Sequence, residues 1–554
     1  MTDTEDLYES RPGAGARALD AAVAATPPME SGELEPTLAS GALAGPTPVA
    51  FGGDTPVRYN TPPADDIGSE GNFTDQDVNG ILSGYAWDAR ELTYSFPARG
   101  RFYGNPYGSD EHKEFRPLLD TQQDTVRYSL DLISQYTGMR FTEVTETETE
   151  HATLRFANSY LPPTSWAYYP GDYNESGDVW LGNVMDDPAT VAGYAMNTIL
   201  HEIGHALGLK HGHETGGYGD LPAEHNSTEW SLMTYNSYIG TPIGYYANAE
   251  GSGNQTYMSN DIGALQHLYG ANYKTYAGKT NYSWDPTTGV MSINGEAQYQ
   301  WSEDRVYRSL WDGNGSDTYN LSKYTTGVQV DLRPGEWSTF SRAQLADLDE
   351  YIAGSHLAHG NVLNSHLYNG DLRSLIENAR GGTGDDLITG NDGANLLVGG
   401  AGLDKLEGLD GDDRLKGDAG GDSLYGADGL DRLKGGAGGD LMFGGGDADV
   451  IQGNTGADTL NGGGGADRLS GGSQGDTFVF RGRFDADVVT DFAVTGAPDV
   501  IQFGVEVFST FSDVQAALSQ VGADVLIEAG WQGNILLTDV QLEELTKDHF
   551  AFVS

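Results

Sequence analysis

The residues with the clearest chemistry are three histidines in the string HEIGHALGLKH, residues 201–211. Positions four apart on a helix lie on one face, so His201 and His205 can aim their imidazoles at a single metal ion. Gly208 allows the chain to leave the helix sharply, because glycine adopts a left-handed conformation at little cost, and His211 can then turn back as a third nitrogen ligand. Three protein ligands leave the fourth position of a tetrahedral zinc ion open to water, which is typical of a catalytic site.

Glu202 is placed beside this predicted site without being needed as a ligand. A zinc ion lowers the pKa of its bound water to about 7 and polarises a carbonyl group. We expect Glu202 to take the proton of that water and to pass it to the leaving amine. His213 and His225 are alternative third ligands, but only His211 has the spacing that follows the glycine turn.

A second string, SLMTY at 231–235, supports the zinc site. The histidine string resembles the extended signature of the metzincins, and SLMTY resembles the Met-turn beneath their zinc, with Met233 as the methionine. Alone, a methionine in such a string is most often ordinary core. In the serralysin branch of the metzincins a tyrosine follows two residues after the methionine, and here that residue is Tyr235. The resemblance implies that Tyr235 is a further zinc ligand, which swings away to hydrogen-bond the transition state.

Internal repeats occupy the C-terminal half of the chain. Residues 381–479 divide into eleven consecutive nonapeptides without an insertion. The first position is always glycine, the eighth is always apolar, and the sixth is aspartate in ten repeats. This is the calcium-binding RTX pattern G-G-x-G-x-D-x-U-x. The predicted calcium ligands are the sixth positions, Asp386, Asn395, Asp404, Asp413, Asp422, Asp431, Asp440, Asp449, Asp458, Asp467 and Asp476.

The repeat predicts a parallel β-roll with 18 residues per turn. Glycines let each half-turn direct backbone carbonyls and the sixth-position carboxylate at a cation. The block holds 17 Asp, one Glu and six Lys or Arg, a net charge of −12, so it should be disordered without cations. A flexible glycine-aspartate linker is the alternative, but the strict register favours the roll. Departures from the pattern at Asn395, Asp447 and Gln474 mark the weakest expected sites.

Composition limits the partners of the chain. Its 554 residues include no cysteine, so disulfides cannot stabilise it. With 30 basic and 81 acidic residues the net charge is −51, which argues against nucleic acid or an anionic membrane and favours bound cations. There is no run of 18 apolar residues, so no membrane span is expected. The first residues lack the basic and apolar segments of a secretory signal peptide.

The expected fold class is an α/β catalytic domain, α+β and metzincin-like, followed by an all-β parallel β-roll. The glycine-rich, proline-rich start is predicted to be a propeptide or disordered leader. The expected parts are the leader at 1–70, the zinc protease domain at 71–280, a connecting β-rich region at 281–380, the RTX roll at 381–479, and a C-terminal β region with a secretion signal at 480–554.

Apolar periodicity predicts the elements of the catalytic domain. The strand candidate at 177–183 lies close enough before the zinc helix to be the edge strand on which a peptide substrate could bind. The expected strands are 92–97, 152–159 and 177–183, and the expected helices are 115–138, 195–211 (including its exit) and 257–272.

Taken together, the chain after about residue 73 resembles the serralysin family of secreted bacterial zinc proteases. Further matching segments are IGALQHLYGAN at 262–272, RSLWDGNGSDTYN at 308–320, LIENARGGTGDD at 375–386 and DVVTDFAVTGAPDVIQF at 487–503. The resemblance implies one zinc, several calcium ions, protein or peptide substrates, an extracellular location, and export by a type I (ABC) apparatus that reads an uncleaved C-terminal signal. The last ten residues, LTKDHFAFVS, resemble such a signal, although they could be only a closing strand. A monomer is expected.

Two points remain open from the sequence. Residues 333–375 are longer and more helix-like than the usual connector. Their histidines, His356, His359 and His366, could form another metal site, but a surface loop is expected because no flanking carboxylate pattern organises them. A calcium-dependent adhesion protein with a vestigial or latent protease domain is an alternative function. An RTX cytotoxin is disfavoured, because no apolar pore-forming segment exists.

Overall fold

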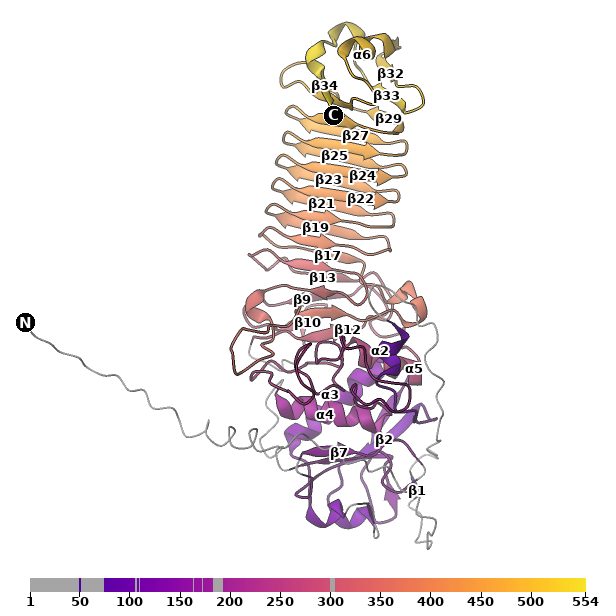
Figure 1. Cartoon of the computed structure of the whole chain (residues 1–554), viewed down its shortest axis with the longest axis vertical. Coiled ribbons are helices and arrows are strands. Elements are labelled where there is room, and N and C mark those ends of the chain that lie inside the picture. Colours follow the sequence, from indigo (N-terminus) through magenta and orange to yellow (C-terminus); the bar gives the residue numbers. More distant parts are fainter. Residues whose placement is uncertain are drawn as a thin grey trace, which may run out of the picture.

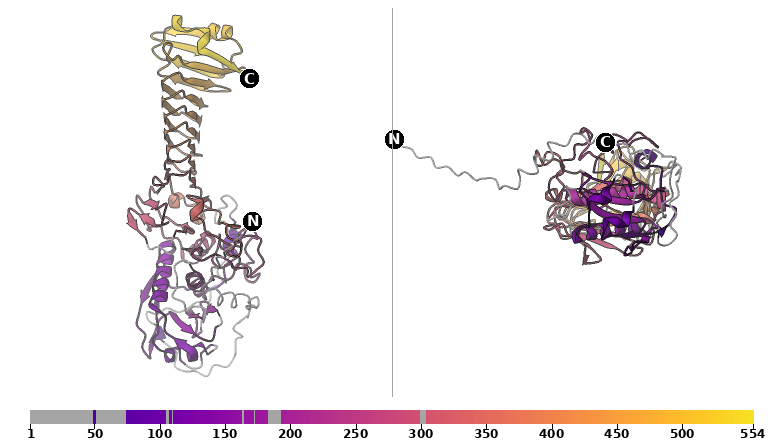
Figure 2. Two further views of the ribbon diagram at one scale, coloured as in Figure 1. Left: turned by 90° about the vertical axis from the view of Figure 1, so that its left-hand side faces the viewer. Right: turned by 90° about the horizontal axis from the view of Figure 1, so that it is seen from below.

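The computed structural model describes residues 49–50, 74–104, 107–108, 110–162, 164–171, 173–182, 193–298 and 304–554. The molecule is elongated: a lobe with most of the helices lies at one end, and a narrow stack of strands leads from it to a small C-terminal cap (Figures 1 and 2). None of the helices in these ranges is long and apolar enough to cross a membrane. The leader predicted at 1–70 lies outside the described residues, except for strand β1 (Val49–Ala50), which pairs with β5 (Glu150–His151).

A mixed sheet supports the helical lobe. Its strands follow the order β4-β2-β6-β8-β7, and β3 pairs with β6 outside this path. Every residue of β6 and β8 is buried, as expected for inner strands covered on both faces. The strands are β2 (Glu91–Ser95), β3 (Phe115–Arg116), β4 (Arg140–Glu143), β6 (Leu154–Ser159), β7 (Ser165–Ala167) and β8 (Asp178–Leu181).

The prediction that residues 177–183 form the edge strand is wrong. Strand β8 pairs in parallel with β6 on one side and antiparallel with β7 on the other. The physical reason is that the chain returns through β7 before it enters β8, so β7 covers the edge that β8 would expose. The residues of β7 are half-buried, and β7 is therefore the outer strand of this sheet.

The α-helices of the lobe within the described residues are α2 (Asp75–Asn79), α3 (Asp120–Tyr136), α4 (Tyr194–Ala206) and α5 (Ser259–Tyr269). Helix α3 is amphipathic, and Val126, Leu130 and Ile133 at helical spacing point into the core. Helix α4 is more deeply enclosed, because apolar residues occupy most of its surface. The two helices pack together in one core with the sheet (Figure 1). Short 3-10 helices lie at Gly100–Tyr103 and Glu111–Glu114.

Two long sheets run through the rest of the molecule. One has 14 strands in the order β11-β10-β9-β13-β17-β19-β21-β23-β25-β27-β29-β33-β32-β31, and the other has nine in the order β14-β18-β20-β22-β24-β26-β28-β30-β34. The 14-stranded sheet consists of β9 (Asn281–Trp284), β10 (Met291–Ile293), β11 (Glu296–Ala297), β13 (Thr318–Asn320), β17 (Asn378–Arg380), β19 (Leu396–Ala401), β21 (Arg414–Ala419), β23 (Arg432–Ala437), β25 (Val450–Thr455), β27 (Arg468–Ser473), β29 (Asp485–Val489), β31 (Leu518–Val521), β32 (Asp524–Glu528) and β33 (Gly533–Leu537). The nine-stranded sheet consists of β14 (Gln329–Asp331), β18 (Leu387–Thr389), β20 (Lys405–Glu407), β22 (Ser423–Asp428), β24 (Leu441–Gly446), β26 (Thr459–Gly463), β28 (Thr477–Phe480), β30 (Val500–Gly504) and β34 (Phe550–Val553).

Successive nonapeptides alternate between these two sheets, and each strand pairs in parallel with the strand 18 residues away. Leu397 pairs with Leu415, for example, and Leu415 with Leu433. These eighth-position side chains are at most 1% exposed and form the core between the sheets. The predicted fold class, an α/β lobe followed by a parallel β-roll, is confirmed.

The segment 333–375 departs from its prediction. It contains no α-helix; instead β16 (Val362–Asn364) pairs with β12 (Arg308–Leu310) and β15 (Trp337–Ser338) in a small sheet. Its 3-10 helices are Arg342–Gln344, Tyr368–Gly370 and Leu372–Ser374. Leu348, Ala358 and Leu363 pack on Met258 and Tyr307, so burial against the lobe decides the fold of this segment.

The histidines of this segment are correspondingly not all at the surface. His366 is only 8% exposed, which contradicts the predicted surface loop. His359 lies 2.6 Å from a carboxylate oxygen of Glu229, and His356 stacks on Tyr238 with ring centroids 3.7 Å apart. The contacts of His356 and His359 thus pack the segment against the lobe.

The C-terminal cap closes both sheets. It contains α6 (Phe511–Ala517) and 3-10 helices at Leu542–Glu544 and Lys547–His549. The last residues form β34, which pairs in parallel with β30. The closing strand considered for LTKDHFAFVS is therefore present in the fold.

Candidate metal centre

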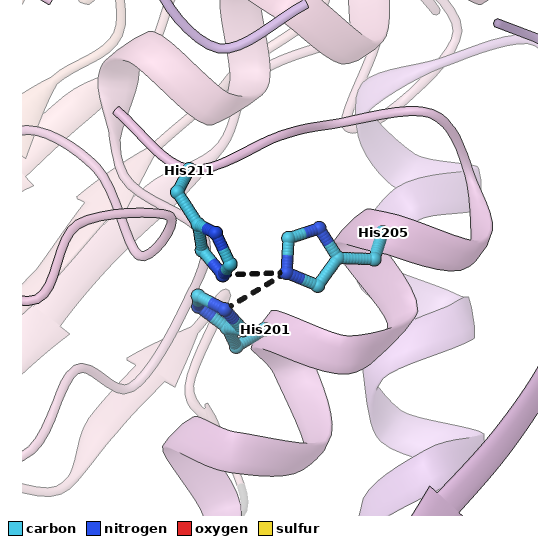
Figure 3. Close-up of side chains that lie close together, drawn as sticks. All are labelled: His201, His205 and His211. Carbon is cyan, nitrogen blue, oxygen red and sulfur yellow. Dashed lines mark hydrogen bonds between the residues drawn. The ribbon is translucent and has the colours of Figure 1, made fainter. Parts of the chain in front are cut away.

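Three imidazoles converge at the end of helix α4 and point toward one another (Figure 3). His205 Nε2 lies 3.0 Å from His201 Nε2 and 3.0 Å from His211 Nε2. The ligand atoms of all three side chains lie within 4.8 Å of one another. His201 and His205 come from successive turns of the helix, and His211 comes from the segment that follows it.

The protonation of these rings is fixed by their other nitrogens, each of which faces an oxygen acceptor. The contacts are His201 Nδ1 to Leu232 O at 2.7 Å, His205 Nδ1 to Leu209 O at 2.6 Å, and His211 Nδ1 to Glu214 Oε1 at 2.7 Å. An oxygen acceptor requires the proton on Nδ1, and burial lowers the pKa of all three rings. Three Nε2 lone pairs therefore face one another, which is repulsive alone and suits a bound cation such as zinc.

The turn that delivers His211 depends on Gly208. The φ of Gly208 is +103°, and a Cβ at this position would stand 2.1 Å from the carbonyl oxygen of Tyr85. Any other residue would strain the backbone and collide with that oxygen. Leu209 N donates to Gly204 O and closes the end of the helix.

The string 231–235 lies directly under the three histidines. The hydroxyl of Tyr235 is 2.6 Å from His211 Nε2. Met233 is fully buried, and its Sδ would be 2.7 Å from a Cβ at Gly204. Gly204, whose role the sequence pattern does not reveal, thus makes room for the methionine beneath α4.

Glu202 is buried beside the histidines. It is 5% exposed, and its Oε2 has no hydrogen-bond partner among the described residues. Burial raises the pKa of Glu202 to about 8. The pKa of Tyr235 is raised mainly by burial and, as the second cause, by the charge of Glu202, so the two side chains are close enough to influence each other. A buried carboxyl group with an unused oxygen is available for proton transfer.

The two alternative histidines lie outside the group of three. The ring of His213 is 5.4 Å from that of His211 and 5.0 Å from that of Tyr235. His225 lies in a turn but is buried, and its Nδ1 is 2.6 Å from Asp77 Oδ1. His225 thus has its hydrogen-bond partner in the protein core, away from the three converging histidines.

Asp261 in α5 supports the site from behind, a role that no sequence motif indicates. Its carboxylate accepts hydrogen bonds from Ser231 Oγ at 2.6 Å and from the backbone N–H groups of Leu232 at 2.8 Å and Met258 at 3.0 Å. Because the carbonyl of Leu232 receives the Nδ1 proton of His201, Leu232 is held from both sides. Asp261 thereby fixes the orientation of a candidate ligand through one intervening residue.

Replacement of Asp261 by alanine should weaken this support. We expect Asp261→Ala to reduce zinc affinity by about 10-fold or more. It should also lower the free energy of unfolding by about 2–4 kcal/mol, because one hydroxyl and two N–H groups lose their buried acceptor. Competition with a chelating dye and urea unfolding measure the two effects, with the exposed Asp88→Ala as control. A zinc affinity equal to that of the control would exclude this role.

The sixth-position aspartates form a second set of oxygen ligands along the roll. From Asp404 to Asp476, the Oδ1 of each accepts the backbone N–H of the residue 18 positions earlier, as for Asp422 N to Asp440 Oδ1 at 2.8 Å. The other oxygen is buried without a hydrogen-bond partner among the described residues in Asp404, Asp413, Asp422, Asp431, Asp440, Asp449, Asp458, Asp467, Asp476 and Asp487. Hard carboxylate and carbonyl oxygens suit calcium, and a cation would satisfy these unused atoms.

The two ends of this series differ from its middle. Asp386 accepts a backbone N–H at both oxygens, from Val328 at Oδ1 and from Gly382 at Oδ2. The single side-chain oxygen of Asn395 accepts the N–H of Asn391. Beyond the eleven repeats, Asp487 Oδ1 accepts from Asp467 N at 2.9 Å. The nonapeptide count misses Asp487, because a longer loop changes the spacing from 18 to 20 residues. At the fourth positions of their repeats, Asp447 and Gln474 have φ of +66° and +82°, a conformation that favours glycine.

A further acidic cluster precedes the roll. Asp312 and Asp317 are buried, and Glu377 Oε2 accepts the N–H of Asp317 at 2.7 Å. Burial is the main cause that raises the pKa of these three carboxyls, to about 7 for Glu377. The string DGNGSDTYN at 312–320, an imperfect nonapeptide, is the signal that could have revealed the cluster.

Comparison with known proteins places both sets of residues in context. The family of the RTX calcium-binding nonapeptide repeat (4 copies) matches residues 375–406, 407–442 and 443–478. Over 337 residues the chain is 31% identical to "Serralysin" of Proteus mirabilis, covering 55% of this chain and 60% of that protein. It is 30% identical to "Serralysin G" of Dickeya chrysanthemi (54% and 59%) and 29% identical to "Metallopeptidase AprA" of Pseudomonas marginalis (59% and 63%). The chain thus spans about three fifths of the length of these relatives.

Proposed function

We propose that this chain, which is 31% and 29% identical to two of these relatives and carries RTX repeats, is a secreted zinc endopeptidase of the serralysin family that depends on calcium for its fold. The observation that carries the proposal is the convergence of three Nε2 lone pairs beside a buried carboxyl group whose Oε2 has no hydrogen-bond partner among the described residues. Zinc bound by His201, His205 and His211 would supply an acidified water and a polarised substrate carbonyl.

The chain's own side chains have separate roles in this proposal. Glu202 accepts the proton of the attacking water and returns it to the leaving amine, and its buried carboxyl group, whose Oε2 has no hydrogen-bond partner among the described residues, is placed for this transfer. Tyr235, adjacent to His211, donates a hydrogen bond from its hydroxyl group to the substrate carbonyl oxygen as that oxygen gains negative charge. Among the described residues the outer strand β7 pairs with a neighbouring strand on one side only, so an extended peptide can add to the sheet at its other edge.

The role of Tyr235 can be tested separately. Tyr235→Phe removes one hydroxyl and keeps the ring that packs between His201 and His213. We expect kcat to fall by about 10²-fold with little change in KM, because loss of one oxyanion donor acts on the transition state. Steady-state kinetics with a fluorogenic peptide measure this. Equal losses in zinc content and activity would instead assign Tyr235 a role in holding the metal.

Calcium and export follow from the C-terminal half. The RTX match and the unused aspartate oxygens support several structural calcium ions along the roll. We further propose that the chain leaves the cell through a type I apparatus and that its C-terminal segment, including β34, carries the address.

A casein zymogram tests the proposed function. Cleavage should occur with zinc and calcium present, disappear after treatment with a zinc chelator, and return when zinc is added back. A band of intact, correctly folded protein without cleavage under any of these conditions would favour the adhesion alternative. Mass spectrometry of the purified chain would show whether a residual leader explains such latency.

A further inference from the structure

The basic residues of the roll are not distributed evenly between its two sheets. Residues 381–479 contain six Lys or Arg. Five of them lie on the outer face of the 14-stranded sheet, and only Lys405 lies on the other sheet. The five are Arg414, Lys416, Arg432, Lys434 and Arg468.

Four of these residues form a compact group, here termed the cationic square. In the pairing of β21 with β23, Arg414 stands directly opposite Arg432, and Lys416 opposite Lys434. All four side chains are exposed. None of them has a carboxylate within ion-pair distance among the described residues. The strands are visible as neighbours in the middle of the roll (Figure 1).

Such an arrangement is unfavourable without a counter-charge. Neighbouring strands lie about 4.8 Å apart, and like charges directly opposite each other on a sheet are destabilising. The sheet does not need these residues for its core, because the buried positions between them are Leu415 and Leu433. An anionic ligand across both strands would remove the repulsion.

On the other sheet, the basic side chain of Lys405 has partners close by. Lys405 Nζ lies 2.5 Å from Glu407 Oε1 and 5.4 Å from the ring centroid of Tyr425. Tyr425 in turn stacks on Phe443 at 5.2 Å. The repeat can therefore accommodate a local partner for a lysine, and the cationic square has none.

Bound calcium would change the net charge around the cationic square. The roll block has a net charge of −12, from 18 acidic and six basic residues, so six divalent ions would cancel it. At about 0.15 M salt, charges beyond roughly 8 Å are largely screened, and an approaching ligand responds mainly to the local surface. With calcium bound inside the roll, that local surface is positive on one face.

We propose that the outer face of β21 and β23 binds a linear acidic polysaccharide with one carboxylate per sugar. A pyranose advances its chain by about one strand spacing, so successive carboxylates of a chain along the roll meet successive strands. Each strand contributes two cations to the contact: β21 contributes Arg414 and Lys416, and β23 contributes their partners Arg432 and Lys434. Arg468 continues the row of Arg414 and Arg432 two strands farther, opposite Val450. The surface would hold the lobe and its metal centre close to an acidic matrix.

The test uses the full-length protein in millimolar calcium and a fluorescently labelled oligogalacturonate of about ten sugars, which is too short to gel. Fluorescence anisotropy should show binding that weakens as salt is raised. The substitution of Arg414, Lys416, Arg432 and Lys434 by glutamine should reduce affinity by about tenfold or more. The matched control replaces four exposed lysines elsewhere, Lys274, Lys279, Lys323 and Lys547, and should bind as the parent does.

Further measurements make the result decisive. Circular dichroism with calcium must show the same strand content in parent and variants, and an Arg414→Lys, Arg432→Lys protein should retain most of the affinity because charge is kept. Hyaluronan, with one carboxylate for every two sugars, should bind more weakly. Equal binding by the square variant and the lysine control would overturn the proposal, as would binding only to phosphatidylglycerol vesicles. Casein cleavage is measured in parallel, and its presence or absence leaves the sugar result unaffected.

Discussion

A Glu202→Gln protein is expected to keep its zinc and to lose about 10²–10⁴-fold in kcat/KM against peptide substrates. Glutamine has nearly the same shape, so the buried space at 5% exposure remains filled. It cannot accept a proton at neutral pH, and the unused carboxylate oxygen that distinguishes this side chain is lost. Zinc content by atomic absorption and kinetics with a fluorogenic peptide give the two quantities.

The control for this variant is Glu250→Gln, an exposed carboxylate in a loop of the same lobe. It should behave as the parent in both measurements. If Glu202→Gln retained a tenth or more of the activity with full zinc occupancy, Glu202 would be removed as the proton acceptor. Loss of zinc together with activity would mean that Glu202 acts on the metal site rather than on the water.

Removal of calcium is expected to unfold the roll while the chain remains intact. Its 99 residues include 31 glycines, whose ordering costs the most backbone entropy, and the net charge of −12 opposes compaction. Buried oxygens from Asp404 to Asp487 would have no cation to satisfy them. Far-ultraviolet circular dichroism should show loss of most strand signal after a calcium chelator is added, and its return with excess calcium.

Magnesium should not restore the signal, because its shorter bonds and strict octahedral geometry do not suit these oxygens. A single change gives a finer test: Asp440→Asn keeps the Oδ1 acceptor for Asp422 N but removes a charge. It should raise the calcium concentration at the folding midpoint, while the exposed Asp428→Asn should not. Strand content that is independent of calcium in the parent would refute the proposed dependence.

Local patterns predicted the parts of this molecule that are built from neighbouring residues. The spacing of His201, His205 and His211 depends on one helix and one glycine turn, and Gly208 has the expected positive φ. The eleven nonapeptides define their own stacking, because each turn repeats the same glycines and the same buried residue. Such short-range rules are written in the sequence itself.

Features that depend on distant pairing were not predictable in the same way. Residues 177–183 have the composition of a strand, but only the return of the chain through β7 decides that β8 is internal. His359 meets Glu229 across 130 positions, and Asp261 supports Leu232 across 29. A residue's own neighbours do not reveal such contacts, and the same limit explains why segment 333–375 was predicted to be more helical than it is.

Because successive repeats lie in alternate sheets, the number of repeats decides which sheet each later strand joins. Removing one nonapeptide would send every later strand to the opposite sheet, and the cap formed by β29, β30 and β34 would meet the wrong edges. Removing two would shorten the roll by one full turn and leave all later pairings unchanged. The length of the roll, and with it the distance between the metal centre and the C-terminus, can therefore change only by whole turns of eighteen residues.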